Sequence, residues 1–109
     1  SRDWSSDVCS SDLISTEPGF YKEGEFGIRL ENLMVVMPCT QPGMKHMLCF
    51  TPLTLVPFDT RFIIRDLLSQ KEIDWLNNYH QNVNNVITNA ATSLSDDEIV
   101  WLTKATAAI

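Results

Sequence analysis

Between residues 14 and 57, short runs of apolar residues are separated by turn-forming residues. Along 26–31, apolar residues alternate with charged ones, which is typical of a strand with one apolar and one polar face. The run 33–37 is entirely apolar and predicts a buried strand. The stretch 47–56 predicts a further strand, at a sheet edge or bulge, because Pro52 cannot donate a ladder hydrogen bond. Turns are expected at 17–19, 23–25 and 38–45.

From residue 58 onward, apolar residues recur every third or fourth position, as on an amphipathic helix. Ser69 with Glu72, and Ser95 with Glu98, form capping boxes, in which two side chains satisfy free N–H groups at a helix start. Two helices are therefore expected after Ser69 and Ser95. Their apolar stripes comprise Ile73, Leu76, His80, Val83 and Ile87, and then Ile99, Leu102, Ala105 and Ile109. Strands followed by helices indicate an α+β fold.

Residues 1–13 differ from the rest of the chain, because they are rich in Ser and Asp and show no period of 2 or 3.6. The string from Asp3 to Leu13 resembles the translation of a sequencing adapter, and we leave 1–13 out of the fold prediction as disordered. A genuine disordered tail is the alternative. On the adapter interpretation, the protein sequence is expected to begin at Ile14, with its preceding part missing.

Composition narrows the possible functions. The chain has 109 residues, of which 44% are hydrophobic, so it can form one domain or part of one. Its 14 acidic and 8 basic residues give a net charge of −6, which argues against nucleic acid as a partner. No apolar run approaches the roughly 20 residues that span a bilayer, so we expect no membrane partner.

The cysteines and the two predicted helices offer no obvious catalytic group. Outside 1–13 only Cys39 and Cys49 remain, too few for a disulfide framework, and we expect both to be reduced in a cytoplasmic protein. His80 lies on the apolar stripe of the first helix and is expected to be a hydrogen-bonded packing residue. Trp75 and Trp101 are expected in packing or in a subunit interface.

Two carboxylates are the best candidates for chemistry. Glu17 precedes a Pro-Gly turn, and Glu31 follows Arg29 by two positions, so that Arg29 and Glu31 share a strand face. If their strands form a hairpin, the two carboxylates converge and require a shared proton or a cation. Carboxylate oxygens suit hard divalent cations. Solvated glutamates and a surface ion pair are the alternative.

Residues 16–32 read TEPGFYKEGEFGIRLEN. This string resembles the pattern EPG(Y/F)Y, a turn, and FGIR(I/L)EN of the Xaa-Pro aminopeptidases, the aminopeptidase P enzymes of the pita-bread metallopeptidase fold. Residues 50–57 resemble its FEPLTLVP strand, and 74–80 resemble its EWLNxYH helix. The resemblance extends from Ile14 to Ile109, with Trp101–Leu102 at the position of a recurring WL pair.

The resemblance implies a site of two divalent metal ions, Mn²⁺ in the first place and Zn²⁺ or Co²⁺ as possibilities, held by two Asp, one His and two Glu. By motif match, Glu17 would bind one ion, Glu31 would bridge both, and Arg29 would support the site. The implied fold is the C-terminal part of the pita-bread sheet in 14–57, a partial catalytic domain, followed by a C-terminal helical extension in 58–109.

The implied reaction removes the N-terminal residue from peptides with proline in second position. The Asp, Asp and His ligands have no counterpart here and would lie before Ile14, so the chain alone is expected to be inactive. Thr51 stands where the family usually has Glu, and 38–47 matches no family motif. Intact relatives of this type imply a cytoplasmic homodimer. The alternative function is a non-catalytic pita-bread interaction or dimerisation module.

Overall fold

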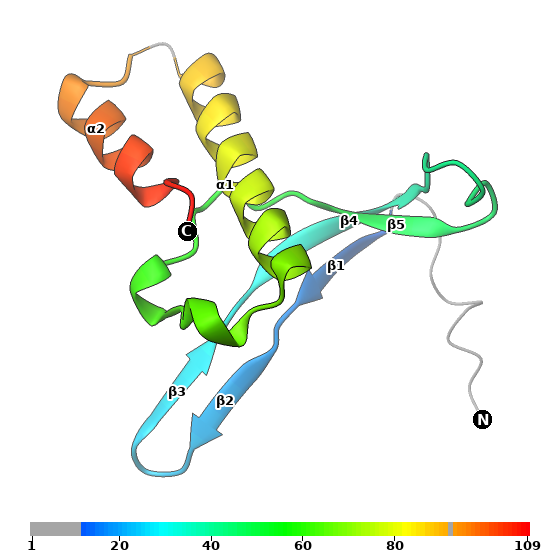
Figure 1. Ribbon diagram of the computed structural model, residues 1–109, viewed down its shortest axis with the longest axis horizontal. Coiled ribbons are helices and arrows are strands. Elements are labelled where there is room, and N and C mark those ends of the chain that lie inside the picture. Colours follow the sequence, from blue (N-terminus) through cyan, green and yellow to red (C-terminus); the bar gives the residue numbers. More distant parts are fainter. Residues whose placement is uncertain (1–11, 92) are drawn as a thin grey trace. The chain divides into compact units, whose positions relative to one another are not determined.

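The computed structural model describes residues 12–91 and 93–109, which divide after Thr54 into two compact units, unit 1 and unit 2. Strands make up the first unit and helices the second, which confirms the α+β fold (Figure 1). The units divide after Thr54, three residues before the boundary expected from the sequence. Of the adapter-like segment 1–13, residues 1–11 lie outside the described residues, whereas Leu13 begins a strand.

Unit 1 contains two antiparallel sheets that share one long hairpin (Figure 1). The larger sheet has the strand order β1-β4-β5, and β2 pairs with β3 in the smaller one. At the tip, Gly24 has a φ of 70°, a left-handed conformation that glycine adopts without strain. The strands are β1 Leu13–Thr16, β2 Gly19–Lys22, β3 Phe26–Arg29, β4 Asn32–Pro38 and β5 Leu48–Pro52.

The apolar run 33–37 lies in a strand as predicted, but the prediction of burial is wrong for most of it. Val36 is fully buried, whereas Leu33 and Met37 are exposed. Strands and loops alone form the described part of unit 1, so no helix of this unit covers the faces of its sheets. The expectation for Pro52 is confirmed, because it ends β5, an edge strand.

The prediction of two reduced thiols is also wrong in this structure. Cys39 and Cys49 form a disulfide, with Cα atoms 5.0 Å apart. The hairpin between β4 and β5 produces this proximity, because Met37 pairs with Cys49 and the N–H of Cys39 donates to the carbonyl of Met47. Sequence spacing does not reveal such a pairing, because the register of the two strands decides it.

Unit 2 begins with two short 3₁₀ helices, η2 Thr60–Phe62 and η3 Arg65–Leu67, which precede α1 Gln70–Ala90 and α2 Asp96–Ala105. Both predicted capping boxes are present. The N–H of Ser69 donates to Glu72 at 2.8 Å, and the N–H of Ser95 donates to Glu98 at 2.8 Å. No helix in the described part of the chain has the length and hydropathy needed to cross a membrane.

The core of unit 2 lies along α1. Its buried residues are Ile73, Leu76, Tyr79, His80 and Val83, with Leu102 from α2. Side-chain hydrogen bonds attach the C-terminal part to α1, because Asn84 donates to Thr106 Oγ1 at 2.9 Å and Asn77 Oδ1 accepts from the N–H of Ile109 at 3.0 Å. Most of α2 is exposed, so its predicted apolar stripe is buried only at Leu102.

Candidate functional site

The carboxylates of Glu17 and Glu31 lie where the two sheets of unit 1 join. Thr16 pairs with Asn32 in the larger sheet, and Gly19 pairs with Arg29 in the smaller one. The register is therefore the same on both sides of the junction, and it places Glu17 opposite Glu31. Between the ladders, the N–H of Leu30 donates to the carbonyl of Pro18 at 2.9 Å. The expected hairpin is thus present.

Arg29 joins the two carboxylates. Its Nη1 lies 3.5 Å from Glu17 Oε2, and its Nη2 lies 3.1 Å from Glu31 Oε2. Ser15 Oγ donates to the other oxygen of Glu17 at 2.7 Å. All three charged side chains remain between two fifths and one half exposed. The structure therefore brings together the three residues that the sequence singled out.

This cluster has the chemistry of a partial cation site. Like charges directly opposite each other destabilise a strand pair, so Glu17 and Glu31 need a cation between them, and Arg29 supplies one here. Carboxylate oxygens are also the ligands that hard divalent cations prefer. Within residues 12–91 and 93–109, no three His, Cys, Asp or Glu side chains are close enough together to hold a metal ion. The residues fit part of a metal site and do not complete it.

Tyr21 flanks the cluster, although the sequence analysis did not select it. A Cβ atom on Gly19 would come within 2.6 Å of the Tyr21 hydroxyl, and one on Gly27 within 2.8 Å of its ring. The Tyr21 ring therefore lies over both glycines, on the strand face that carries Glu17 and Arg29. The period-2 spacing of Glu17, Gly19 and Tyr21 is the sequence signal that could have identified it.

In unit 2, His80 and its neighbour Tyr79 bind the segment before η2. His80 Nε2 accepts from the N–H of Phe58 at 3.1 Å, and the Tyr79 hydroxyl donates to the carbonyl of Val56 at 2.9 Å. Burial lowers the pKa of His80, and a backbone group of Ala107 opposes this effect. His80 is therefore the hydrogen-bonded packing residue that the sequence predicted.

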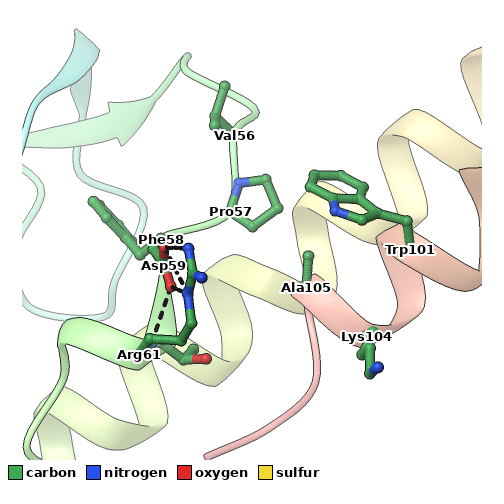
Figure 2. A pocket seen from close by; sticks show the side chains of 9 residues that line it. Val56, Pro57, Phe58, Asp59, Arg61, Trp101, Lys104 and Ala105 are labelled. Carbon is green, nitrogen blue, oxygen red and sulfur yellow. Dashed lines mark hydrogen bonds and ion pairs between the residues drawn. The ribbon is translucent and has the colours of Figure 1, made fainter.

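A cavity of about 540 Å³ opens between this segment and α2 (Figure 2). Trp101, Lys104 and Ala105 line it from α2, opposite the stretch 56–61. Arg61 forms an ion pair with Asp59, and this hydrogen-bonded partner lowers the pKa of Asp59 to about 2. The lining offers the exposed indole of Trp101 and the positive charge of Lys104, which suit binding rather than catalysis.

Comparison with known proteins identifies the class to which these features belong. A family model described as the C-terminal region of peptidase M24 matches residues 46–109. The chain therefore belongs to the peptidase M24 family and corresponds to its C-terminal region.

Within that family, the chain is similar to Xaa-Pro aminopeptidases. It is 40% identical over 96 residues to Aminopeptidase P1 of Arabidopsis thaliana, covering 85% of this chain and 14% of the relative. It is 36% identical over 96 residues to Xaa-Pro aminopeptidase ApepP of Drosophila melanogaster, covering 84% of this chain and 16% of the relative. The chain thus spans about one seventh of the length of these relatives.

A solved structure has a similar fold. The X-prolyl aminopeptidase of Caenorhabditis elegans, described as a cytosolic enzyme with a di-nuclear active site, matches 94% of this chain and 17% of its own length. The TM-score is 0.86 and the sequence identity is 34%. The fold is therefore that of the C-terminal region of this aminopeptidase, as the sequence resemblance implied.

Proposed function

We propose that this chain is the C-terminal portion of a dinuclear-metal aminopeptidase that removes the N-terminal residue from peptides with proline in second position. The observation that carries the proposal is the opposed pair Glu17 and Glu31, joined by Arg29 in one register. The names of the similar proteins support the reaction, and the di-nuclear site of the Caenorhabditis elegans enzyme supports two metal ions. The chain would supply two of five ligands.

Each residue has a distinct role in this proposal. Glu17 would hold one ion and Glu31 would hold both, each through carboxylate oxygen. Paired strands suit a bridging carboxylate, because ladder hydrogen bonds on either side fix its backbone. Arg29 is a positioning residue that offsets the charge of both carboxylates. When bound, Mn²⁺, or Zn²⁺ or Co²⁺ in its place, would activate water and polarise the peptide carbonyl.

Metal titration tests the ligand roles. The isolated chain should bind Mn²⁺ weakly and show no peptidase activity, because two carboxylates leave most of a coordination sphere open. Isothermal titration calorimetry should give heats that disappear in Glu17→Gln and Glu31→Gln and persist in Glu23→Gln, a substitution in the hairpin turn. One-site binding at submicromolar Kd by the isolated chain would contradict the proposal.

The natural reading frame upstream of the Ile14 codon, in place of the adapter-like residues 1–13, tests the reaction itself. We expect that part of the reading frame to encode the Asp, Asp and His ligands, and the complete protein to cleave X-Pro peptides. In that protein, Arg29→Lys should lower kcat/KM by roughly 10–100-fold, as expected for residues that orient ligands. Glu31→Gln should cost at least as much. Apolar residues at the three upstream positions would instead favour a non-catalytic role.

The second candidate is a non-catalytic interaction or dimerisation module of the same fold. The cavity beside Trp101 favours it, because its exposed indole can bury apolar area against a partner. The cluster of Glu17, Glu31 and Arg29 favours the enzyme, because an inactive protein does not need two opposed carboxylates. We further propose that the intact protein is a cytoplasmic homodimer, to which α2 contributes.

A further inference from the structure

The hairpin between β4 and β5 contains a second pair of chemically reactive side chains, separate from Glu17 and Glu31. Cys39 follows β4, and Cys49 lies in β5 opposite Met37. Their Cα atoms are 5.0 Å apart, within the range that a disulfide bridges without backbone movement. The hydrogen bond from the N–H of Cys39 to Met47 holds this register independently of the sulfur atoms.

The surroundings of the two cysteines differ. Cys39 is 8% exposed, and its Sγ lies 3.9 Å from Met44 Sδ, whereas Cys49 is only half-buried. Few side chains are buried in the described part of unit 1: Asn32, Val36 and Cys39. Because so little packing holds this unit together, a covalent link across the hairpin should contribute a large share of its stability.

We propose that Cys39 and Cys49 are a reversible oxidation site, a thiol pair that closes into a disulfide and reopens with the redox state of its surroundings. The chain resembles a cytosolic enzyme, and cytosolic disulfides are usually transient because glutathione keeps thiols reduced. A preformed pair in such a protein suits a switch. The pairing itself rests on the hairpin geometry, and it does not require that Glu17 and Glu31 bind metal.

The reaction is thiol–disulfide exchange with a small disulfide such as oxidised glutathione. The Cys49 thiolate, the more accessible of the two, attacks one sulfur of the glutathione disulfide and releases one glutathione thiolate. The Cys39 thiolate then attacks Cys49 Sγ, forms the protein disulfide and releases the second glutathione. Two protein thiols are oxidised, one glutathione disulfide is reduced, and the two protons pass to the released thiolates.

Peptide mapping tests the pairing in the 109-residue chain. The chain is equilibrated with reduced or oxidised glutathione, alkylated and digested with trypsin, which cuts after Arg29, Lys45 and Arg61. Oxidised glutathione should yield peptides 30–45 and 46–61 joined by a disulfide, and reduced glutathione should yield both peptides alkylated. The oxidation state of Cys9 is measured separately, because Cys9 lies in a different tryptic peptide, 3–22. Persistent alkylation of Cys39 and Cys49 under oxidation, or their pairing with Cys9, would overturn the proposal.

Single substitutions test the order of the two steps. Cys39→Ser should accumulate a glutathione adduct on Cys49, whereas Cys49→Ser should form an adduct at least ~10-fold more slowly, because Cys39 is buried. The control Cys9→Ser should behave as the unsubstituted chain. Equal rates in the two variants would refute the assignment of Cys49 as the attacking thiol.

Hydrogen exchange tests the consequence for the fold. Oxidation should slow exchange of the β4 amides by roughly 10-fold or more in the unsubstituted chain. Cys39→Ser should show no such response to oxidation, and neither should Cys49→Ser. Equal protection in oxidised and reduced chain would show that the bond does not act as a structural switch.

Discussion

At the scale of single residues, Arg29 lets two carboxylates face each other in unit 1. Arg29→Met removes the only side chain that forms ion pairs with both Glu17 and Glu31 among the described residues. The two like charges then stand unscreened across the strand pair, so we expect the free energy of unfolding of unit 1 to fall by about 0.5–1 kcal/mol. Urea unfolding followed by hydrogen exchange at β1 and β4 measures this change.

A second substitution distinguishes the effect of the Arg29 charge on the free energy of unfolding from the effect of its packing. Glu17→Gln should recover most of the stability lost in Arg29→Met, because it removes the repulsion. In the unsubstituted chain, Glu17→Gln should have a smaller effect. If the two substitutions simply add, Arg29 acts through its aliphatic stem and not through its charge.

His80 gives unit 2 a dependence on pH. Its imidazole is fully buried and accepts from the N–H of Phe58, which requires an unprotonated Nε2. Burial lowers its pKa in the folded chain, so the unfolded chain binds more protons below the ordinary value of 6.5. The contribution to stability is therefore complete above about pH 6.5 and is lost as the pH falls through the folded pKa.

Thermal unfolding of unit 2 between pH 7.5 and 5.5 should show this loss as a falling Tm. His80→Gln can still accept from Phe58 and does not titrate, so its Tm should change less over the same interval. His46→Gln, which alters an exposed residue in unit 1, should retain the full dependence. Equal slopes for His80→Gln and the unsubstituted chain would refute the role of His80.

Part of the candidate site could be predicted from the local sequence pattern. The i, i+2 spacing of Arg29 and Glu31 was sufficient to place them on one face, and the convergence with Glu17 required only the hairpin. The disulfide and the position of Tyr21 were missed for another reason. Both depend on which residues stand opposite each other across strands, and a single strand's alternation carries no such information.

At the scale of elements, the helix starts are the most firmly encoded features of the chain. In α1, Ser69 Oγ accepts from the N–H of Glu72, whose carboxylate in turn accepts from the N–H of Ser69. Ser69→Ala removes one half of this exchange and should lower the free energy of unfolding of unit 2 by about 1 kcal/mol. Chemical denaturation followed by tryptophan fluorescence in a chain with Trp4→Phe and Trp101→Phe, which leaves Trp75 as the fluorophore, measures it. Ser69→Asp, which still caps, should cost much less.

The limits of each element were predicted with different success. Both capping boxes fixed the helix starts, because their hydrogen bonds involve residues three apart. The end of α1 has no such local signal, because its asparagines disfavour helix, yet Asn84 forms a hydrogen bond to Thr106 that the local sequence does not show. The predicted burial of β4 was wrong for a similar reason. An apolar sequence shows that a strand can be buried, but it does not show which other elements cover the strand.

At the scale of the whole molecule, α2 carries an exposed row of residues whose charges are self-complementary. Asp97, Val100, Trp101 and Lys104 follow the i, i+3, i+4, i+7 spacing of one helix face, and all are exposed. A second copy packed antiparallel across a two-fold axis would place Asp97 against Lys104 of the partner subunit, with the apolar residues between them. If the protein is the homodimer proposed above, this charge pattern predicts that α2 meets its own copy.

Charge exchange on this face tests the dimer. Lys104→Asp creates like charges at both symmetric contacts and should weaken association by roughly 10-fold, as should Asp97→Lys. The double variant restores opposite charges in exchanged positions, so its dissociation constant should return towards that of the unsubstituted chain. Lys71→Asp makes the same charge change on α1 and should leave association unaltered. Sedimentation equilibrium measures each constant, and the α2 contact is excluded if the double variant is as weak as the single ones or if the chain stays monomeric throughout.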